Sequence, residues 1–326
     1  MNKKILITGG SGLVGSDLVS ALLEKGGYEL FLVGRNETLP EYNDKVKKIK
    51  IDFAADWNES ELPPDLYAII HLSQAENFRD FPGKAKEVFY INTLSTLRLV
   101  DHATKSKINH FIFASSGGVY GTDGMFREDD RGGYTKEMGF YLGTKYCSEV
   151  LLENYFDLLN VIILRFFFVY GKGQNQSMLI PRLISRVKDG ESITLQGQSG
   201  MKINPVHVSD ATKAIIASLN LQGSHKLNVA GPEVLSLREI GEKIGTAVGA
   251  VLGATVGNEV AKNRAQADEG GYRERERCQE TSRTERREEI IGYDVDYQYQ
   301  GRTYSTRMDH QPGSRIRVAV RVEPLE

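Results

Sequence analysis

Short apolar runs alternate with segments of helical spacing over the first two thirds of the chain. The opening run "KKILIT" is followed by a glycine-rich turn, after which Leu18, Leu22 and Leu23 recur at helical spacing. Later apolar runs, "YELFLVGRN", "KIKIDF", "YAIIHLS" and "HFIFASS", are separated by helical or loop segments. Because strands buried on both faces read as continuous apolar runs, the pattern predicts an α/β fold with a parallel sheet covered on both sides.

A glycine triplet, Gly9, Gly12 and Gly15, lies between the first predicted strand and the first predicted helix. Such a turn lets the backbone approach a pyrophosphate, while free amides at the helix N-terminus point at the anion. Glycine-rich turns also occur for purely structural reasons, but here a strand precedes the turn and a helix follows it. We therefore predict a dinucleotide site at these glycines, with Leu13 and Val14 at the start of the helix.

The end of the next predicted strand bears on the choice of cofactor. An acidic residue there would accept from the ribose hydroxyls of NAD, whereas an arginine suits the extra phosphate of NADP. This chain has Gly34 followed by Arg35. The sequence therefore favours NADP over NAD, and the alternative is that Arg35 is only a solvated loop residue.

Tyr141 and Lys145 are four residues apart in "FYLGTK", so on a helix they share one face. Lowering a tyrosine pKa from about 10 to near 7 needs roughly 4 kcal/mol of preferential stabilisation of the phenolate. An adjacent ammonium and the positive ring of a cofactor could supply it. The alternative is an exposed tyrosine beside a lysine on a helix surface.

Composition narrows the class of protein. The 326 residues are 40% hydrophobic and 26% charged, enough for two domains with a large core. The net charge of −2 argues against a general polyanion-binding surface, and no nucleic-acid motif is present. Cys147 and Cys278 are too few and too distant for a zinc site, so no metal is expected. The start "MNKKILITGG" has too few consecutive apolar residues to form the core of a signal peptide. We therefore predict a cytoplasmic protein.

Six motifs together resemble the extended short-chain dehydrogenase/reductase family, the group of NAD-dependent epimerases and dehydratases. They are "TGGSGLVG", "HLSQAE", "FIFASSGGVYG", "YLGTK", "RFFFVYGKGQ" and "NPVHVSDA", and the resemblance covers about residues 3–245. It implies a doubly wound, Rossmann-type nucleotide-binding domain over 1–165 and an interleaved, partial substrate domain over 166–246.

The resemblance also implies roles for individual residues. Tyr141 would be the general acid/base, Lys145 would bind the nicotinamide ribose and lower the tyrosine pKa, and Ser116 would hydrogen-bond the reacting oxygen. The cofactor would further be lined by Asp52, Phe53, His71, Leu72 and Ser73.

Departures from the family pattern narrow the reaction. Two glycines follow Ser116 where dehydratases carry an acidic residue, so elimination of water is not expected. Phe168 stands where sugar-nucleotide epimerases have asparagine, and Ile203 stands at the position of the arginine that grips the substrate diphosphate, leaving Lys202 as the nearest cation. What remains is hydride transfer at a secondary alcohol or carbonyl, with epimerisation of a nucleotide sugar as a family-level inference.

The segment "GEKIGTAVGAVLGATVGNEV" carries glycine at every fourth residue from 241 to 257. On a helix these glycines form a ridge that costs roughly 4–5 kcal/mol unless a partner packs closely against it. Its uncharged part is about 21 Å long as a helix, shorter than the roughly 30 Å core of a bilayer. We therefore expect a partner for the ridge, and no membrane crossing by this segment alone.

From about residue 247 the chain resembles the glycine-zipper surface-antigen family of bacterial envelopes. The segments are a zipper helix over 247–258, a charged linker over 259–289 and a small antiparallel β unit over 290–326. In the β unit, alternation in "YDVDYQYQGRTYSTRM" around a two-residue turn at Gln300 and Gly301 predicts a hairpin, and the same alternation in "SRIRVAVRVEP" predicts a further strand. The joining of two patterns suggests a chimera. The alternative is that the zipper is the last helix of the substrate domain.

The leading prediction is a cytoplasmic NADP- or NAD-dependent epimerase or reductase that acts on a small molecule. Two alternatives stay open: an envelope structural or binding protein that acts through the tail, and a cofactor-binding domain without turnover. Membrane contact and self-association are expected only through residues 244–257.

Overall fold

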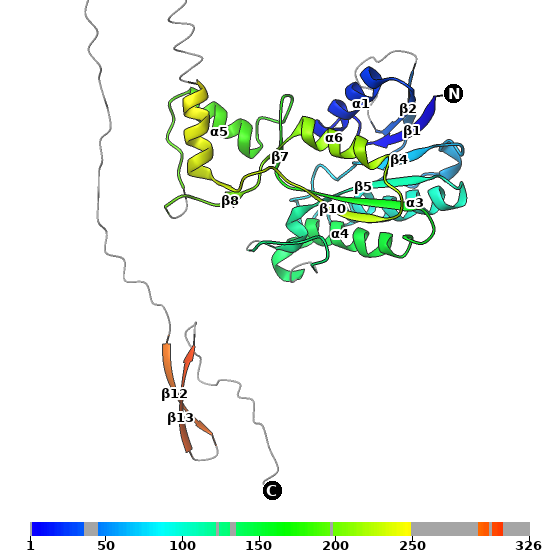
Figure 1. The fold of residues 1–326 in the computed structure, drawn as a ribbon. Coiled ribbons are helices and arrows are strands. Elements are labelled where there is room, and N and C mark those ends of the chain that lie inside the picture. The colour runs from blue at the N-terminus through cyan, green and yellow to red at the C-terminus, as the bar shows by residue number, and fades with distance from the viewer. Residues whose placement is uncertain are drawn as a thin grey trace, which may run out of the picture. The chain divides into compact units, whose positions relative to one another are not determined.

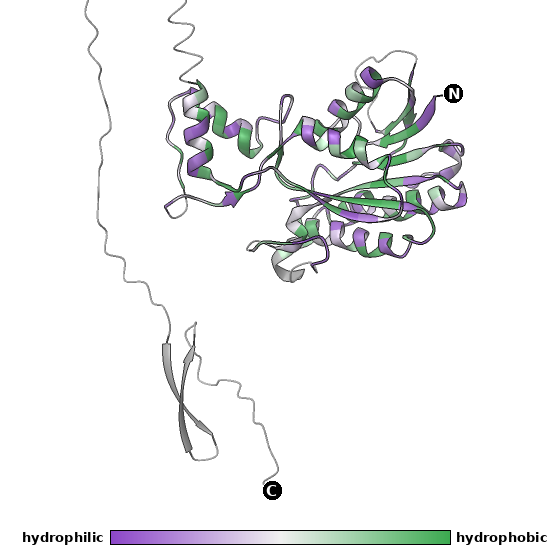
Figure 2. Cartoon of the chain, viewed as in Figure 1, coloured by the Kyte–Doolittle hydropathy of each residue, from purple (hydrophilic) through white to green (hydrophobic). Residues whose placement is uncertain are grey.

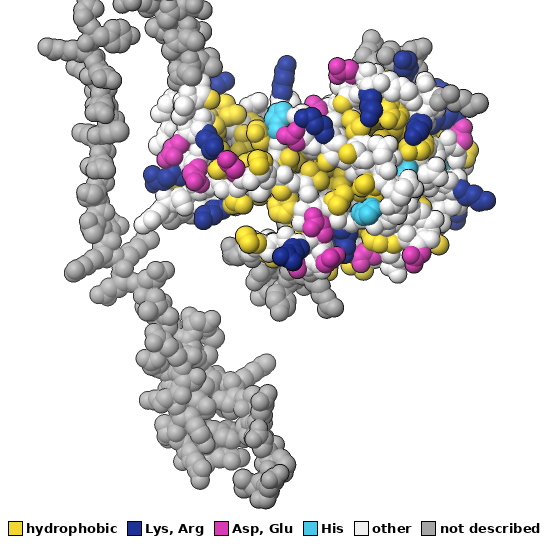
Figure 3. Space-filling view, viewed as in Figure 1, with side chains coloured by type: hydrophobic (Ala, Val, Ile, Leu, Met, Phe, Trp, Pro, Cys, Tyr) yellow, Lys and Arg dark blue, Asp and Glu magenta, His cyan; other side chains and the backbone are white. Residues whose placement is uncertain are grey.

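The computed structural model describes residues 2–35, 45–121, 124–130, 135–195, 198–248, 293–299 and 302–308. It forms two units, Met1–Ala265 and Gln266–Glu326. None of the described helices combines the length and the apolar character needed to cross a membrane. On the face shown in Figure 3, the described lysines and arginines are interspersed with aspartates and glutamates.

A seven-stranded sheet in the order β10-β6-β5-β4-β1-β2-β3 organises the first unit (Figure 1). Every neighbouring pair is parallel. The strands are β1 Lys3–Thr8, β2 Tyr28–Gly34, β3 Val46–Lys50, β4 Ala68–His71, β5 His110–Ser116, β6 Asn160–Phe166 and β10 His225–Val229. This confirms the predicted parallel, Rossmann-type sheet. The strand order reverses between β1 and β4, and such a switch point is where open α/β sheets bind ligands.

Helices cover both faces of this sheet. One face carries α1 (Leu13–Lys25) and α6 (Val208–Ser218), which contact each other. The other carries α3 (Ser95–Lys105) and α4 (Thr135–Glu153), together with α2 (Ala85–Phe89), the π-helical turn η2 (Tyr90–Leu94) and the short 3-10 turns η1 (Glu59–Glu61) and η3 (Gly117–Tyr120). Figure 2 shows hydrophobic strands between helices whose outer faces are hydrophilic.

The alternation of side chains along each strand divides the apolar residues between two cores. In β1, Leu6 joins the cluster on the α3 and α4 side, whereas Ile5 and Ile7 join the cluster beneath α1 and α6. The same alternation separates Phe111 from Ile112 in β5. Both sides of the strand are therefore buried, which explains the continuous apolar runs of the sequence.

A smaller region follows β6. It contains β7 (Val169–Tyr170) paired with β9 (Val206–His207), β8 (Lys202–Ile203) paired with β11 (Leu235–Ser236), the helix α5 (Leu179–Lys188) and a helix over residues 237–248. Its core is a third cluster with three buried apolar residues, Leu183, Ile203 and Ile240. We call α5, β8, β11, residues 237–248 and the described residues beside these elements (189–195, 198–201 and 234) the small region.

The first glycines of the ridge lie in this small region. Residues 241–248 are helical, a Cβ added at Gly241 would lie 3.6 Å from Ile193, and one at Gly245 would lie 4.0 Å from Val187. This part of the ridge thus faces the small region's own side chains, as the last-helix alternative expects. Residues 249–258 and the charged linker lie outside the described residues.

The second unit contains a two-stranded antiparallel ladder. β12 (Tyr293–Tyr299) pairs with β13 (Arg302–Met308), and Tyr297 lies opposite Tyr304. These strands fall where the alternating sequence predicts a hairpin. The further strand predicted in "SRIRVAVRVEP" lies outside the described residues.

Candidate active site

The glycine turn joins β1 to α1. The N–H of Gly12 donates to the carbonyl of Gly9 at 3.0 Å, and Gly9 has a φ of 70°, in the left-handed region. A Cβ at Gly15 would lie 2.1 Å from the Gly9 oxygen, so only glycine fits there. Gly12 caps the helix without a side-chain bond, which leaves the first N–H groups of α1 available to an anion.

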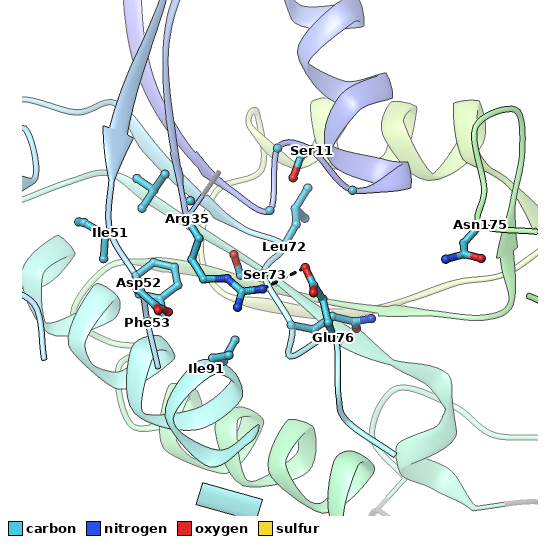
Figure 4. Close-up of a pocket in the computed structure, with 16 residues that line it drawn as sticks. Ser11, Arg35, Ile51, Asp52, Phe53, Leu72, Ser73, Glu76, Ile91 and Asn175 are labelled. Atoms are coloured by element: carbon cyan, nitrogen blue, oxygen red, sulfur yellow. Dashed lines mark ion pairs between the residues drawn. The ribbon is translucent and has the colours of Figure 1, made fainter. Parts of the chain in front are cut away.

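A pocket of about 400 Å³ opens in front of this turn (Figure 4). Seven of the predicted cofactor residues line it, namely Gly9, Gly12, Arg35, Asp52, Phe53, Leu72 and Ser73. Leu13, Val14 and Gly15 belong to α1 beside the pocket and are not part of its lining. The prediction missed other lining residues, among them Gln74, Glu76, Ile91 and Asn175. Gln74 and Glu76 lie in the "HLSQAE" motif, which could have indicated them, whereas Ile91 and Asn175 lie outside the six motifs and reach the pocket only in the folded chain.

Arg35 and Glu76 reach toward each other across this pocket. Arg35 follows β2 and Glu76 follows β4, and the guanidinium Nη2 lies 3.0 Å from the carboxylate Oε1 (Figure 4). Arg35 therefore has a carboxylate partner inside the pocket and is more than the solvated loop residue of the alternative interpretation.

Asp52 and Phe53 form one wall of the pocket. An Asp52 carboxylate oxygen accepts from the N–H of Ala54 at 3.0 Å, which holds the turn after β3. The Phe53 ring lies 5.4 Å from Trp57 and 6.1 Å from His71, so it is fixed by edge-on aromatic contacts.

His71 ties the switch point together. Its Nδ1 hydrogen-bonds Thr8 Oγ1 at 2.7 Å, its Nε2 hydrogen-bonds Thr96 Oγ1 at 3.0 Å, and Thr8 Oγ1 accepts from the N–H of Ser73 at 3.1 Å. Burial lowers the pKa of His71 to about 3, with the charge of Lys145 acting in the same direction. The ring is thus neutral and links the end of β1 to the pocket wall after β4.

Tyr141 is oriented by the segment that follows β4. Its hydroxyl donates to Gln74 Oε1 at 2.8 Å, and its ring lies 4.6 Å from that of Phe78, over which the guanidinium of Arg79 lies at 4.5 Å. Burial raises the pKa of Tyr141 to about 12, and Arg79 opposes this rise. The predicted lowering of this pKa depends on the positive ring of the cofactor as well as on Lys145, so it stays a prediction.

Lys145 is buried one turn further along α4, and its Nζ donates to the carbonyl of Ala114 at 2.9 Å. Burial lowers its pKa to about 8, while the charge of Glu149 acts in the opposite direction. The ammonium thus donates to the backbone near the end of β5.

A buried ion pair supports the same helix. Arg165 Nη2 lies 2.6 Å from a carboxylate oxygen of Glu149, and its Nε lies 3.1 Å from both carboxylate oxygens. Both side chains are at most 1% exposed. The Ser115 hydroxyl donates to the same carboxylate, and Arg165 Nη1 donates to the Tyr120 hydroxyl. The pair therefore fixes α4 to β5 and β6.

Ser116 ends β5, and its Oγ accepts from the N–H of Gly118 at 3.2 Å. A Cβ at Gly117 would lie 2.5 Å from the Phe167 ring, and one at Gly118 would lie 2.9 Å from Leu142. Phe167 and Leu142 thus occupy the space that side chains after Ser116 would need. This agrees with the lack of an acidic residue there.

The substrate side departs from the family pattern in structure as well. Phe168 is 46% exposed and has a φ of 28°, a left-handed conformation that favours glycine and asparagine. Ile203 is buried in the core of the small region, so this position cannot present a cation to a diphosphate. Within the described part of the chain, no group of His, Cys, Asp and Glu side chains is arranged to bind a metal.

Comparison with known proteins gives one consistent family. The model of the NAD dependent epimerase/dehydratase family matches residues 5–230. A UDP-N-acetyl-alpha-D-glucosaminuronate decarboxylase from Bacillus cytotoxicus is 28% identical over 257 residues, covering 75% of this chain and 80% of that protein. A dTDP-4-dehydro-6-deoxyglucose reductase from Escherichia coli is 26% identical, covering 74% and 80%.

Solved structures agree on the fold. The structure of MoeE5 in complex with UDP-glucose and NAD is 28% identical, with a TM-score of 0.64, covering 77% of this chain and 82% of that one. A UDP-glucuronic acid 4-epimerase from Bacillus cereus is 24% identical with a TM-score of 0.66, covering 76% and 83%, and supports the fold alone.

Proposed function

Because the chain belongs to the NAD dependent epimerase/dehydratase family, we propose that it transfers a hydride between NAD and a secondary alcohol or carbonyl of a nucleotide sugar. One observation carries the proposal: the Tyr141 hydroxyl donates to Gln74, and Gln74 lines the pocket in front of the glycine turn. The candidate acid/base and the candidate cofactor pocket are thereby adjacent. Relatives that act on nucleotide sugars support the substrate class.

The pocket suits a dinucleotide because its backbone leaves no room for side chains where a pyrophosphate would approach. A Cβ at Gly9 or Gly15 would collide with backbone atoms, and the uncapped start of α1 offers N–H groups to the phosphates. In this proposal Phe53 and Leu72 enclose the adenosine, and Ser73 lies along the cofactor. When bound, NAD accepts or returns the hydride.

We assign the proton to Tyr141. Its pKa of about 12 in the structure must fall for proton transfer near neutral pH, and Arg79 already acts in that direction. Lys145 holds the end of β5 through Ala114 and would meet the nicotinamide ribose, while Ser116 would donate to the reacting oxygen. Epimerisation or reduction is favoured over elimination, because Phe167 fills the space beside Gly117.

Two more detailed predictions are supported only by sequence patterns. Preference for NADP rests on Gly34 and Arg35, and the pairing of Arg35 with Glu76 now argues against it. The chimera, self-association and membrane contact through 244–257 are predictions that rest on the glycine repeat. The first glycines of this repeat, Gly241 and Gly245, face Ile193 and Val187.

The test is a coupled binding and turnover assay on the full chain. NAD is supplied with UDP-glucose or UDP-glucuronate, and cofactor reduction and sugar products are followed. Tyr141→Phe should retain NAD binding and reduce turnover about 100-fold or more, since only the proton-transfer step loses its group. Tyr146→Phe on the same helix is the control and should keep turnover. Undiminished turnover in Tyr141→Phe would rule out this mechanism.

A further inference from the structure

The ion pair between Arg35 and Glu76 lies inside the pocket that the proposed function assigns to the dinucleotide. Both residues line the pocket, and the paired atoms are 3.0 Å apart. Figure 4 shows the Arg35 side chain extended from the end of β2 toward Glu76, on the opposite wall. The side chains are 43% and 75% exposed, so a bound ligand can reach both.

We propose that Glu76 sets the cofactor preference of this enzyme, by holding the Arg35 guanidinium and opposing a phosphate on the adenosine ribose. NAD then binds in preference to NADP. The inference rests on the proposed function, because it requires that the adenosine half of a dinucleotide occupies this pocket.

The physical argument concerns which anion the guanidinium serves. An arginine at the end of the second strand accommodates the ribose phosphate of NADP when it is free to bind it. Here the guanidinium already has a carboxylate partner. A ribose phosphate beside Arg35 would therefore lie next to the negative charge of Glu76, and the pair would have to separate. NAD brings no such charge to this part of the pocket.

Other acidic groups near Arg35 are already engaged. The charge of Arg35 contributes to lowering the pKa of Glu87, but a hydrogen bond from Lys84 is the main cause. The Glu87 carboxylate accepts from Lys84 at 2.9 Å and from Asn77 at 3.4 Å. Asp52 lines the same pocket and accepts from the N–H of Ala54. Glu76 is the acidic residue that pairs with Arg35 itself, which makes it the discriminating residue.

The experiment is a fluorescence titration of the full chain with NADH and with NADPH, which reads binding without turnover. We expect the parent to bind NADH more tightly. Glu76→Gln should change NADH affinity less than about twofold and tighten NADPH about fivefold or more, as removal of one nearby charge predicts. Adding Arg35→Met to Glu76→Gln should abolish the gain for NADPH, because the cation that accepts the phosphate is then lost.

The matched control is Asp210→Asn. It breaks another exposed pair, between Asp210 and Lys213 at 2.9 Å, away from the pocket, and should leave the ratio of the two affinities unchanged. An unchanged ratio in Glu76→Gln, or a parent that prefers NADPH, would overturn the role of Glu76 while leaving the proposed function intact. If the parent binds neither cofactor, both proposals fail together.

Discussion

The sheet and the small region bury their apolar residues in different ways. Six of the seven strands, all except β10, contribute to two cores, one under α1 and α6 and one under α3 and α4. The small region has one cluster with three buried apolar residues, Leu183, Ile203 and Ile240. Its surface also exposes Met201 (52%) and Val234 (62%). The sheet is thus stabilised by a hydrophobic core on each of its two faces, whereas the small region is stabilised by a single hydrophobic cluster.

This difference separates the two halves of the proposed site. The cofactor pocket is formed by the ends of β1, β2 and β4, and each of these strands is hydrogen-bonded to neighbours in the sheet. On the substrate side, Phe168 is half exposed and Ile203 belongs to the small core. We infer that the pocket keeps its shape without ligand, whereas the substrate side depends more on what packs against the small region.

The largest predicted effect comes from the buried ion pair of the sheet region. Glu149→Gln leaves the guanidinium of Arg165 buried without its counter-charge, which should lower the free energy of unfolding by about 3–5 kcal/mol. Urea denaturation measures it. Glu153→Gln is the control, because Glu153 lies four residues later on α4 and pairs with Lys226 near the surface, where the loss should be about 0–1 kcal/mol. Equal losses would mean that burial does not distinguish the two pairs.

A second prediction applies one substitution to both regions. Leu22→Ala removes a fully buried side chain from the core beneath α1 and should cost about 4 kcal/mol. Leu183→Ala acts in the small cluster, which can close around the lost volume more readily, and should cost about 2 kcal/mol. Hydrogen exchange should confine the second effect to the small region. A larger cost for Leu183→Ala would reverse the comparison.

A third prediction concerns the glycine turn at the carboxyl end of β1, inside the sheet. Gly15→Ala puts a Cβ 2.1 Å from the Gly9 oxygen, so the backbone must move, at a cost of about 1–3 kcal/mol and with NAD affinity reduced at least about tenfold. Gly12→Ala is the control for stability, because its Cβ would lie 3.3 Å from the same oxygen and needs only a small shift. Thermal unfolding measures the stability of both variants, and cofactor titration measures the NAD affinity of Gly15→Ala. Equal losses of stability in the two variants would contradict the steric argument.

Local geometry decided which features the sequence could predict. The strands were predictable because both alternating sets of side chains, such as Leu6 and Ile7, enter a core. The glycine turn was predictable because close backbone approach imposes glycine at fixed spacing. The pairing of β12 with β13 followed from alternation and a short connection.

The features that the sequence did not predict depend on contacts between distant segments. Glu76 meets Arg35 only because β4 and β2 flank β1 in the sheet, so that the segments following β4 and β2 face one pocket. The spacing of Tyr141 and Lys145 likewise did not reveal that the Lys145 ammonium donates to the carbonyl of Ala114 or that burial raises the pKa of Tyr141. No spacing rule marks such partners, because they are chosen by packing.

The smallest predicted effect distinguishes the regions by pH. Burial lowers the pKa of His71 to about 3 from its usual 6.5, so between these values the unfolded chain binds a proton that the folded chain does not. The free energy of unfolding therefore carries no penalty from His71 above about pH 6.5, and it falls by about 1.4 kcal/mol per pH unit as the pH drops below that value.

In the small region the group with a shifted pKa is Glu239, whose carboxylate accepts from Ser236. Its contribution to stability is lost only as the pH falls below the usual 4.5. Urea denaturation between about pH 6 and about pH 5 should thus show a dependence that His71→Gln reduces by about one proton, whereas exchange in residues 237–248 should not follow it. A parent and a His71→Gln variant with the same pH dependence would mean that the ring is not held neutral at the switch point.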